Sequence, residues 1–137
     1  MRKRFALLWT TVVLGLALML PASTAAATYG SINFLSGYCS GNNTVNATFK
    51  LVKYSGFYAS RLTMTAKGQG YYNGSWHNEY NIGTWTKNIS TSGKASMQRY
   101  FWYNPGHSGK HRIKVIGKIW DGGYLIATGT EVSGWCN

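Results

Sequence analysis

The feature that most constrains this chain is a two-residue alternation of apolar and polar side chains, which recurs after residue 27 between clusters of Gly, Asn and Ser. Alternation with this period is typical of β-strands that bury one face, and no segment after the first 27 residues shows the 3.6-residue period of a helix. The pattern predicts an all-β fold, either a small antiparallel β-sandwich (Ig-like or jelly-roll-like) or a small barrel. Strands are expected near residues 30–35, 46–54, 57–66, 69–72, 75–80, 82–88, 94–103, 110–120 and 124–133.

The first 27 residues have the layout of a secretory signal peptide. The cationic start MRKRF precedes the apolar run ALLWTTVVLGLALML and the small-residue segment PASTAAA. The apolar run is shorter than the roughly 20 residues of a membrane span, so cleavage after Ala27 is expected. Residues 1–27 would then be removed, and residues 28–137 would form a single secreted, extracellular domain without a transmembrane segment. The layout indicates a bacterial Sec-type signal.

Export would place Cys39 and Cys136, the two cysteines of the chain, in an oxidising compartment. With two cysteines the pairing is forced, so one disulfide is expected to tie the start of the domain to its last residue but one. Closing a loop of roughly 100 residues removes about 4.7 kcal/mol of unfolded-state entropy at 25 °C.

The charge balance favours anionic partners. Of the 14 Lys and Arg residues, three belong to the expected leader, so the mature domain has 11 against three acids and a net charge of about +8. This excess suits anionic cell-wall polymers, acidic glycans, lipid headgroups or nucleic acid, the last not favoured. With three acids in the domain, a glycosidase site that needs a pair of carboxylates is nearly excluded. The GxSxG motif of serine hydrolases is also absent from the sequence. No enzyme activity and no cofactor are expected.

The segment WDGGY predicts a hairpin that joins strands 110–120 and 124–133 through a two-residue turn at Asp121-Gly122. This register places Arg112 opposite Glu131 and turns Ile113 and Val115 toward the core. One outer face would then carry four cations, namely Lys110, Arg112, Lys114 and Lys118.

The segment RYFWYNPGHSGKHRIK predicts a second hairpin, in which strand 94–103 returns through NPGHSG into strand 110–120. A six-residue loop would place Tyr103 opposite Lys110, Phe101 opposite Arg112 and Arg99 opposite Lys114. Cations beside aromatic rings suit sugars, bases or headgroups. The predicted binding face comprises Arg99, Phe101, Tyr103, Lys110, Arg112, Lys114 and Lys118. Two alternatives stay open: a one-residue change in the loop turns Tyr100 and Trp102 outward, or the aromatic residues are buried in a central strand.

The segment GQGYYNGSWHNEY holds a secondary candidate site. Asn73-Gly74 predicts a type I′ turn that pairs Tyr71 with Trp76, Gly70 with His77 and Gly68 with Glu79. His77 and Glu79 would share a face opposite glycines, where they could act as acid and base. The alternative is a solvated hairpin in which His77 bonds Glu79. The secondary site comprises His77, Glu79, Trp76 and Tyr71.

No metal site is expected. His107 and His111 have the four-residue offset of two ligands on one helix face, but here the interval crosses a Pro-Gly turn into a strand.

These features together favour a secreted, cationic, non-enzymatic binding protein that acts at cell envelopes, as a small antibacterial protein or toxin component, or as a cell-wall or glycan binder. One alternative is an adaptor subunit of a secreted protein complex that docks through strand edges, with residues 28–37 as a loose strand. A second alternative is a small ribonuclease-like enzyme that uses His77 and Glu79. The expected partner is an anionic cell-surface polymer or glycan, or a secreted protein.

Overall fold

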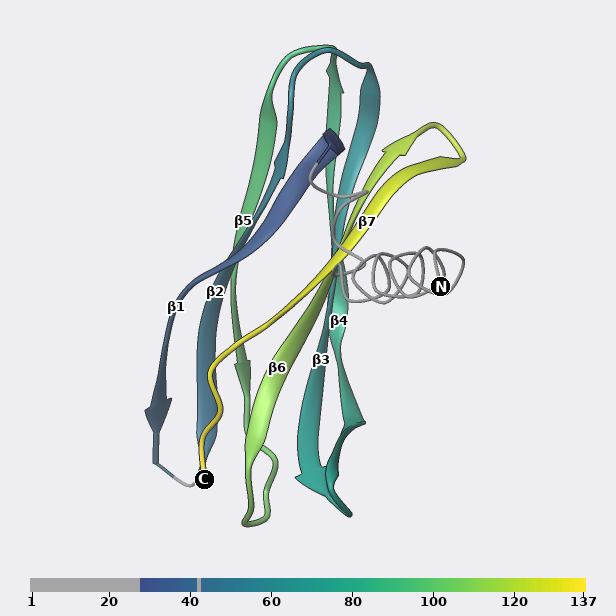
Figure 1. The fold of residues 1–137 in the computed structure, drawn as a ribbon. Helices are drawn as coiled ribbons and strands as arrows, with labels where there is room; N and C mark the ends of the chain where they lie inside the picture. Colours follow the sequence, from purple (N-terminus) through teal and green to yellow (C-terminus); the bar gives the residue numbers. More distant parts are fainter. Residues whose placement is uncertain (1–27, 42) are drawn as a thin grey trace, which may run out of the picture.

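Two antiparallel sheets pack face to face in the computed structural model, which describes residues 28–41 and 43–137 (Figure 1). The strands are β1 (Gly30–Ser40), β2 (Thr44–Lys53), β3 (Ala59–Tyr72), β4 (Ser75–Thr91), β5 (Ala95–Tyr103), β6 (His111–Asp121) and β7 (Tyr124–Val132). One sheet has the order β1-β2-β5 and the other β4-β3-β6-β7. The expected small all-β sandwich is confirmed. The expected signal peptide, residues 1–27, lies outside the described residues. Within the described part of the chain, no helix is long and apolar enough to cross a membrane.

The core lies between the two sheets and follows the period-two pattern of the sequence. Along β6, Ile113, Val115 and Ile119 are at most 2% exposed, and these residues and Gly117 alternate with partly exposed ones. Phe49 of β2 is fully buried and packs between Phe34 and Phe101 at ring-centroid distances of 5.6 and 6.1 Å. Burying one side chain of this size stabilises the fold by about 1.5–3 kcal/mol.

Two pairs of expected short strands are continuous strands in the structure. Segments 57–66 and 69–72 fall in β3, which begins at Ala59, and segments 75–80 and 82–88 fall in β4. Gly68 does not end a strand: it lies beside a register shift, and a Cβ at this position would come within 2.5 Å of the Tyr103 ring. The glycine therefore marks a close approach between the sheets, which single-strand patterns cannot distinguish from a turn.

The expected hairpin between residues 94–103 and 110–120 is wrong. β5 pairs with β2, placing Phe101 opposite Ala47 and Tyr103 opposite Val45, whereas β6 pairs with β3 and β7. The connection thus crosses from one sheet to the other, a distance of about 10 Å that its residues span easily.

The inward and outward faces of β5 are consequently the reverse of those in the leading prediction. Phe101 and Tyr103 are core residues, 2% and 5% exposed, while Tyr100 and Trp102 are 53% and 60% exposed. Arg99 is exposed on the edge strand opposite Phe49, and its expected pairing with Lys114 does not form. Phe101 and Tyr103 are therefore excluded from an exposed binding face.

The β6–β7 turn forms one residue later than expected, at Gly122-Gly123, because Asp121 pairs with Tyr124. A further register shift at Ile119/Trp120 leaves Glu131 opposite Val115, so its expected pair with Arg112 does not form. The inward-facing residues of β6 are nevertheless those expected.

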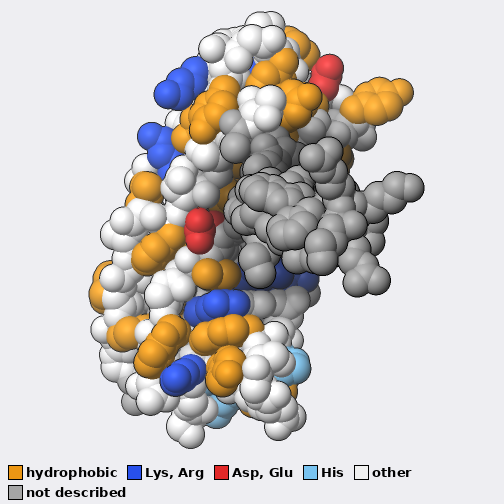
Figure 2. Space-filling view, viewed as in Figure 1, with side chains coloured by type: hydrophobic (Ala, Val, Ile, Leu, Met, Phe, Trp, Pro, Cys, Tyr) orange, Lys and Arg blue, Asp and Glu red, His pale blue; other side chains and the backbone are white. Residues whose placement is uncertain are grey.

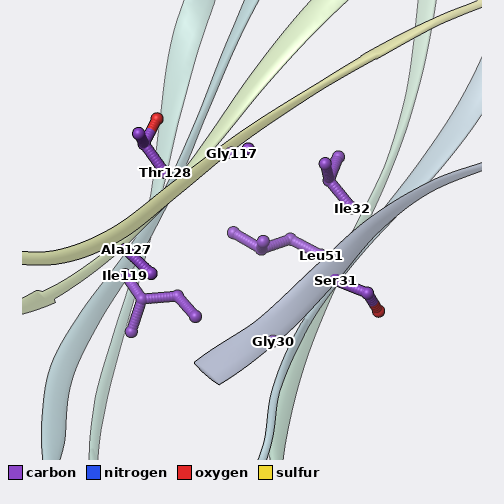
Figure 3. A pocket seen from close by; sticks show the side chains of 9 residues that line it. Gly30, Ser31, Ile32, Leu51, Gly117, Ile119, Ala127 and Thr128 are labelled. Atoms are coloured by element: carbon purple, nitrogen blue, oxygen red, sulfur yellow. The ribbon is translucent and has the colours of Figure 1, made fainter. Parts of the chain in front are cut away.

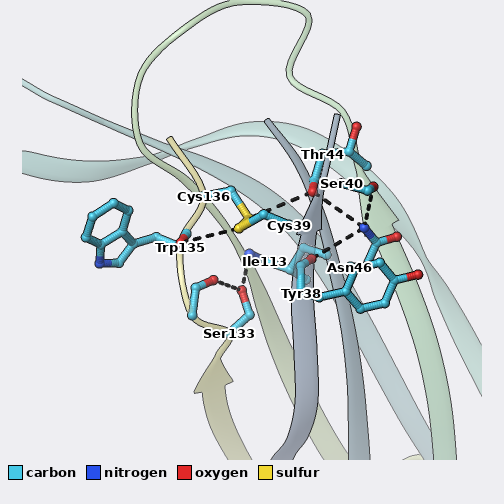
Figure 4. Close-up of a disulfide and its surroundings, with 10 residues drawn as sticks. Tyr38, Cys39, Ser40, Thr44, Asn46, Ile113, Ser133, Trp135 and Cys136 are labelled. Atoms are coloured by element: carbon cyan, nitrogen blue, oxygen red, sulfur yellow. Dashed lines mark hydrogen bonds between the residues drawn. A yellow bond between two sulfur atoms is a disulfide. The ribbon is translucent and has the colours of Figure 1, made fainter. Parts of the chain in front are cut away.

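The disulfide between Cys39 and Cys136 is present, with Cα atoms 5.6 Å apart (Figure 4). It joins the end of β1 to the segment after β7, whose Cys136 backbone exchanges two hydrogen bonds of 2.8 and 2.9 Å with His111. β1 pairs with β2 along its length, so the prediction of a loose strand at residues 28–37 is wrong.

The sheets meet closely where β1 passes β7. Gly30, Ile32, Leu51 and Gly117 surround a cavity of about 10 Å³ there (Figure 3). A Cβ at Gly117 would lie 2.9 Å from Leu51 Cδ1. A cavity of this size holds about one water molecule, so this end of the sandwich is packed core.

Candidate functional site

The outer face of the four-stranded sheet gathers most of the cations that the sequence placed together. Arg112, Lys114 and Lys118 alternate with the buried residues of β6, and Lys110 directly precedes the strand. The period-two pattern alone sufficed to place these four side chains, because alternate residues of a strand share a face.

The neighbouring strand β3 adds two cations that were not predicted from the sequence. Lys67 lies directly opposite Lys114, and Arg61 lies opposite Trp120. Counting every second residue of β3 would have placed them on one face, but not beside β6, because that pairing is not local. Like charges directly opposite one another destabilise a sheet, so the Lys67–Lys114 pair does not contribute to the stability of the fold.

Aromatic rings lie among these cations. The Arg112 guanidinium lies 4.1 Å from the Trp76 ring centroid, and the Lys110 ammonium lies 4.5 Å from that of Trp135. Tyr71 contacts Trp76 edge-on at 5.3 Å. The sequence predicts Tyr71 and Trp76 in one site with His77, whereas the structure places them beside Lys110 and Arg112.

A second aromatic contact lies at the other end of the same face. Arg61 and Lys118 lie 4.9 and 5.7 Å from the Trp120 ring. Trp120 is held by a hydrogen bond of 3.0 Å from its Nε1 to Thr63 Oγ1. We call the whole surface the basic face; it comprises Arg61, Lys67, Tyr71, Trp76, Lys110, Arg112, Lys114, Lys118, Trp120 and Trp135. Figure 2 shows Lys and Arg side chains interleaved with hydrophobic ones in the lower part of its view.

Arg112 is the most constrained cation of the basic face. Its Nε donates a 2.8 Å hydrogen bond to Gln69 Oε1, and Gln69 Nε2 in turn donates to Asn78 Oδ1 at 2.9 Å. Burial lowers the pKa of Arg112 from its ordinary value, although an arginine stays protonated at neutral pH. The guanidinium is therefore held in one orientation against Trp76.

No carboxylate neutralises the basic face. Of the three acids of the chain, Asp121 lies at the β6–β7 turn and Glu131 lies opposite the inward-facing Val115. Glu79 contacts the buried Tyr103. The positive charges of this face are thus available to an external anion.

The secondary site predicted at His77 and Glu79 does not form an acid–base pair. The Asn73-Gly74 turn and the Gly70–His77 register are as expected, but His77 Nε2 bonds Ser75 Oγ and the Tyr72 carbonyl at 2.9 and 3.1 Å. A register shift at Gly68/Gln69 leaves Glu79 unpaired across the strands.

Glu79 belongs instead to a polar cluster with two histidines. Its Oε1 lies 3.5 Å from His107 Nε2 and its Oε2 lies 3.6 Å from His111 Nε2. Tyr103 donates a 2.7 Å hydrogen bond to Glu79 Oε2. No metal site was expected at His107 and His111, because their spacing in sequence does not place two ligands on one strand face. The structure nevertheless brings both side chains to the carboxylate of Glu79.

A groove of about 350 Å³ lies between the edges of β4 and β5. Its walls include Tyr80, stacked on Tyr103 at 6.3 Å, and Trp85, edge-on to Phe101 at 5.0 Å. Exposed Tyr100 and Trp102 border the same groove.

Comparisons with known proteins indicate the fold and no particular function. No family model and no curated protein sequence matches the chain. Among solved structures, a Bacteroides fragilis protein assigned as a beta-galactosidase superimposes with a TM-score of 0.51 at 13% identity, covering 75% of this chain and 16% of that one. An Archaeoglobus fulgidus protein covers 75% of this chain and 90% of its own length at 10% identity, with a TM-score of 0.35. The chain thus spans about a sixth of the first of these proteins.

Proposed function

We propose that this chain is a secreted, non-enzymatic, cationic binding protein whose basic face binds an anionic polymer of a cell envelope. The observation that carries the proposal is the combination of six cations and four aromatic rings on one sheet face without a carboxylate. The groups lie on an open sheet face, which suits an extended polymer with repeated charges.

The spacing of the cations supports a repeating ligand. Alternate residues of one strand lie about 6.6 Å apart, and neighbouring strands lie about 4.8 Å apart. Lys67, Lys114 and Arg112 thus form a two-dimensional array of charge. Trp76 and Trp135 add flat apolar surfaces on which sugar rings could stack beside the charges.

The test measures binding of the purified protein to isolated bacterial cell walls at low and high salt. The variant is Lys67→Gln with Lys114→Gln, and the matched control is Lys50→Gln with Arg99→Gln, which removes the same charge outside the basic face. A basic residue near an anionic surface contributes about 1 kcal/mol, so the first variant should bind about 10–30-fold more weakly. The control should bind nearly as the parent does.

Thermal unfolding separates binding from folding in this experiment. Because Lys67 and Lys114 face each other across β3 and β6, neutralising both relieves repulsion and should not lower the melting temperature. Equal loss of binding in both variants would reduce the effect to net charge and overturn the proposed face. Salt-resistant capture of one secreted protein would instead favour the adaptor alternative.

A further inference from the structure

We propose that Glu79, His107 and His111 form a binding site for a divalent transition metal ion of the zinc class. We call these three residues the His-Glu cluster. The site is independent of the basic face and goes beyond the proposed function.

The distances within the His-Glu cluster match ligands around one ion. Zinc binds histidine nitrogen and carboxylate oxygen at about 2.0–2.2 Å, so tetrahedral neighbours lie about 3.3–3.6 Å apart. The two histidine–carboxylate separations are 3.5 and 3.6 Å, and one ligand atom of each residue lies within 4.8 Å of the others. These separations are too long for hydrogen bonds, yet all three groups converge.

The hydrogen bond of His107 leaves its Nε2 available to a cation. Its Nδ1 lies 3.1 Å from the Ser108 carbonyl oxygen, which can only accept, so Nδ1 carries the hydrogen. In the neutral ring, Nε2 then directs a lone pair toward the Glu79 carboxylate. Two electron-rich atoms are stable in this arrangement when a positive ion lies between them. A backbone carbonyl that fixes the tautomer in this way is the usual partner of a metal-binding histidine.

His111 provides an independent observation. It is 1% exposed, its Nδ1 has no hydrogen-bond partner, and its Nε2 faces Glu79 Oε2 across 3.6 Å. Burying an imidazole without polar partners is costly. Coordination through Nε2 would supply one strong partner, whereas Nδ1 would stay without one.

Tyr103 and Gly70 position the carboxylate. Tyr103 donates to Oε2 from a buried side chain, which fixes the orientation of Glu79. Gly70 lies beneath the carboxylate, and any Cβ at this position would overlap it. Tyr103 is therefore a positioning residue of the proposed site.

The donor set determines the class of ion. Two imidazoles and one carboxylate suit zinc and related transition ions, whereas magnesium and calcium prefer oxygen ligands alone. His107 is 57% exposed, so a fourth coordination position would open to solvent and hold water.

The experiment uses the protein freed of metal by chelation. We expect it to bind one equivalent of Co²⁺ with the visible absorption bands of tetrahedral cobalt, and Zn²⁺ should displace the cobalt. Calorimetry with Ca²⁺ or Mg²⁺ should show no binding at the same concentrations. Absence of a stoichiometric cobalt spectrum would overturn the proposal.

Three variants locate the site. His107→Ala changes an exposed loop residue and should weaken Zn²⁺ binding at least 100-fold, while His77→Ala, the matched control, should leave it unchanged. Tyr103→Phe should weaken binding about 10-fold, as expected for a group that orients a ligand. Unchanged binding in His107→Ala, or an equal loss in His77→Ala, would contradict the assignment. The Lys67→Gln/Lys114→Gln variant should bind zinc as the parent does. The test of the metal site is therefore independent of the test of the basic face.

Discussion

Tyr103 links the hydrophobic core to the polar end of the sandwich. Its ring lies over Gly68 and its hydroxyl donates to Glu79. Burial, followed by the hydrogen bond and the charge of Glu79, raises the pKa of Tyr103 above its ordinary value of 10.0. The folded state therefore retains this proton at a pH where the unfolded state has lost it.

This raised pKa predicts a difference at alkaline pH. Above pH 10 the unfolded chain binds fewer protons than the folded one, so the free energy of unfolding falls as pH rises through this range. Tyr103→Phe removes the group from both states. In denaturant titrations at pH 9 to 11.5, the variant should lose less stability than the parent does. Parallel curves for the two proteins would show that the Tyr103 pKa is not raised.

Gly68 offers a second prediction at the scale of one residue. Gly68→Ala places a methyl group against the Tyr103 ring, and overpacking of this kind costs about 1–3 kcal/mol. Gly123→Ala is the control, because nothing lies within 4 Å of the added Cβ there. Urea unfolding should show the loss in the first variant alone, and equal losses in both variants would show that contact with the Tyr103 ring is not the cause.

At the scale of elements, β5 shows what a local sequence pattern can and cannot predict about a strand. Alternation correctly divides Phe101 and Tyr103 from Tyr100 and Trp102, but it does not say which pair is buried. That choice depends on pairing with β2, which lies about 50 residues earlier in the chain. The alternation of β6 and the Asn73-Gly74 turn are local, and both were predicted correctly, whereas β3 and β4 were each divided into two strands and the β6–β7 turn was placed one residue early.

The burial of β5 is tested by a pair of neighbouring substitutions. Phe101→Ala should lower the free energy of unfolding by about 3–5 kcal/mol, because its ring is 2% exposed and packs against Phe49. Trp102→Ala, next to it and 60% exposed, should cost far less. The reverse order would mean that β5 presents its other face to the core.

The two candidate sites also differ in how far they could be predicted from local sequence patterns. Four cations of the basic face lie on β6 or immediately before it, so the sequence sufficed to group them. The His-Glu cluster combines a bulged residue of β4, a connection between sheets and the start of β6. Neither the bulge nor the crossing leaves a recognisable spacing, and therefore His107 and His111 were not predicted to meet Glu79.

At the scale of the whole molecule, the disulfide closes the chain. Cys39 and Cys136 are 97 residues apart in sequence, and their cross-link restricts the unfolded state along most of the domain. Replacing both by Ser should lower the free energy of unfolding by about 4–5 kcal/mol, measured by denaturant titration beside the reduced parent protein. A loss below about 1 kcal/mol would show that the unfolded chain is already restricted without the bond.

The two outer faces of the sandwich differ strongly in charge. The four-stranded sheet presents six cations, whereas among the described residues the outward side of the three-stranded sheet presents Lys50. That side carries exposed Tyr38, Tyr100 and Trp102. The electric field of an anionic surface would therefore orient each approaching molecule with its basic face toward that surface. If the proposed binding occurs, each bound molecule would turn the side with Tyr38, Tyr100 and Trp102 away from the wall, where these rings would be exposed to further partners.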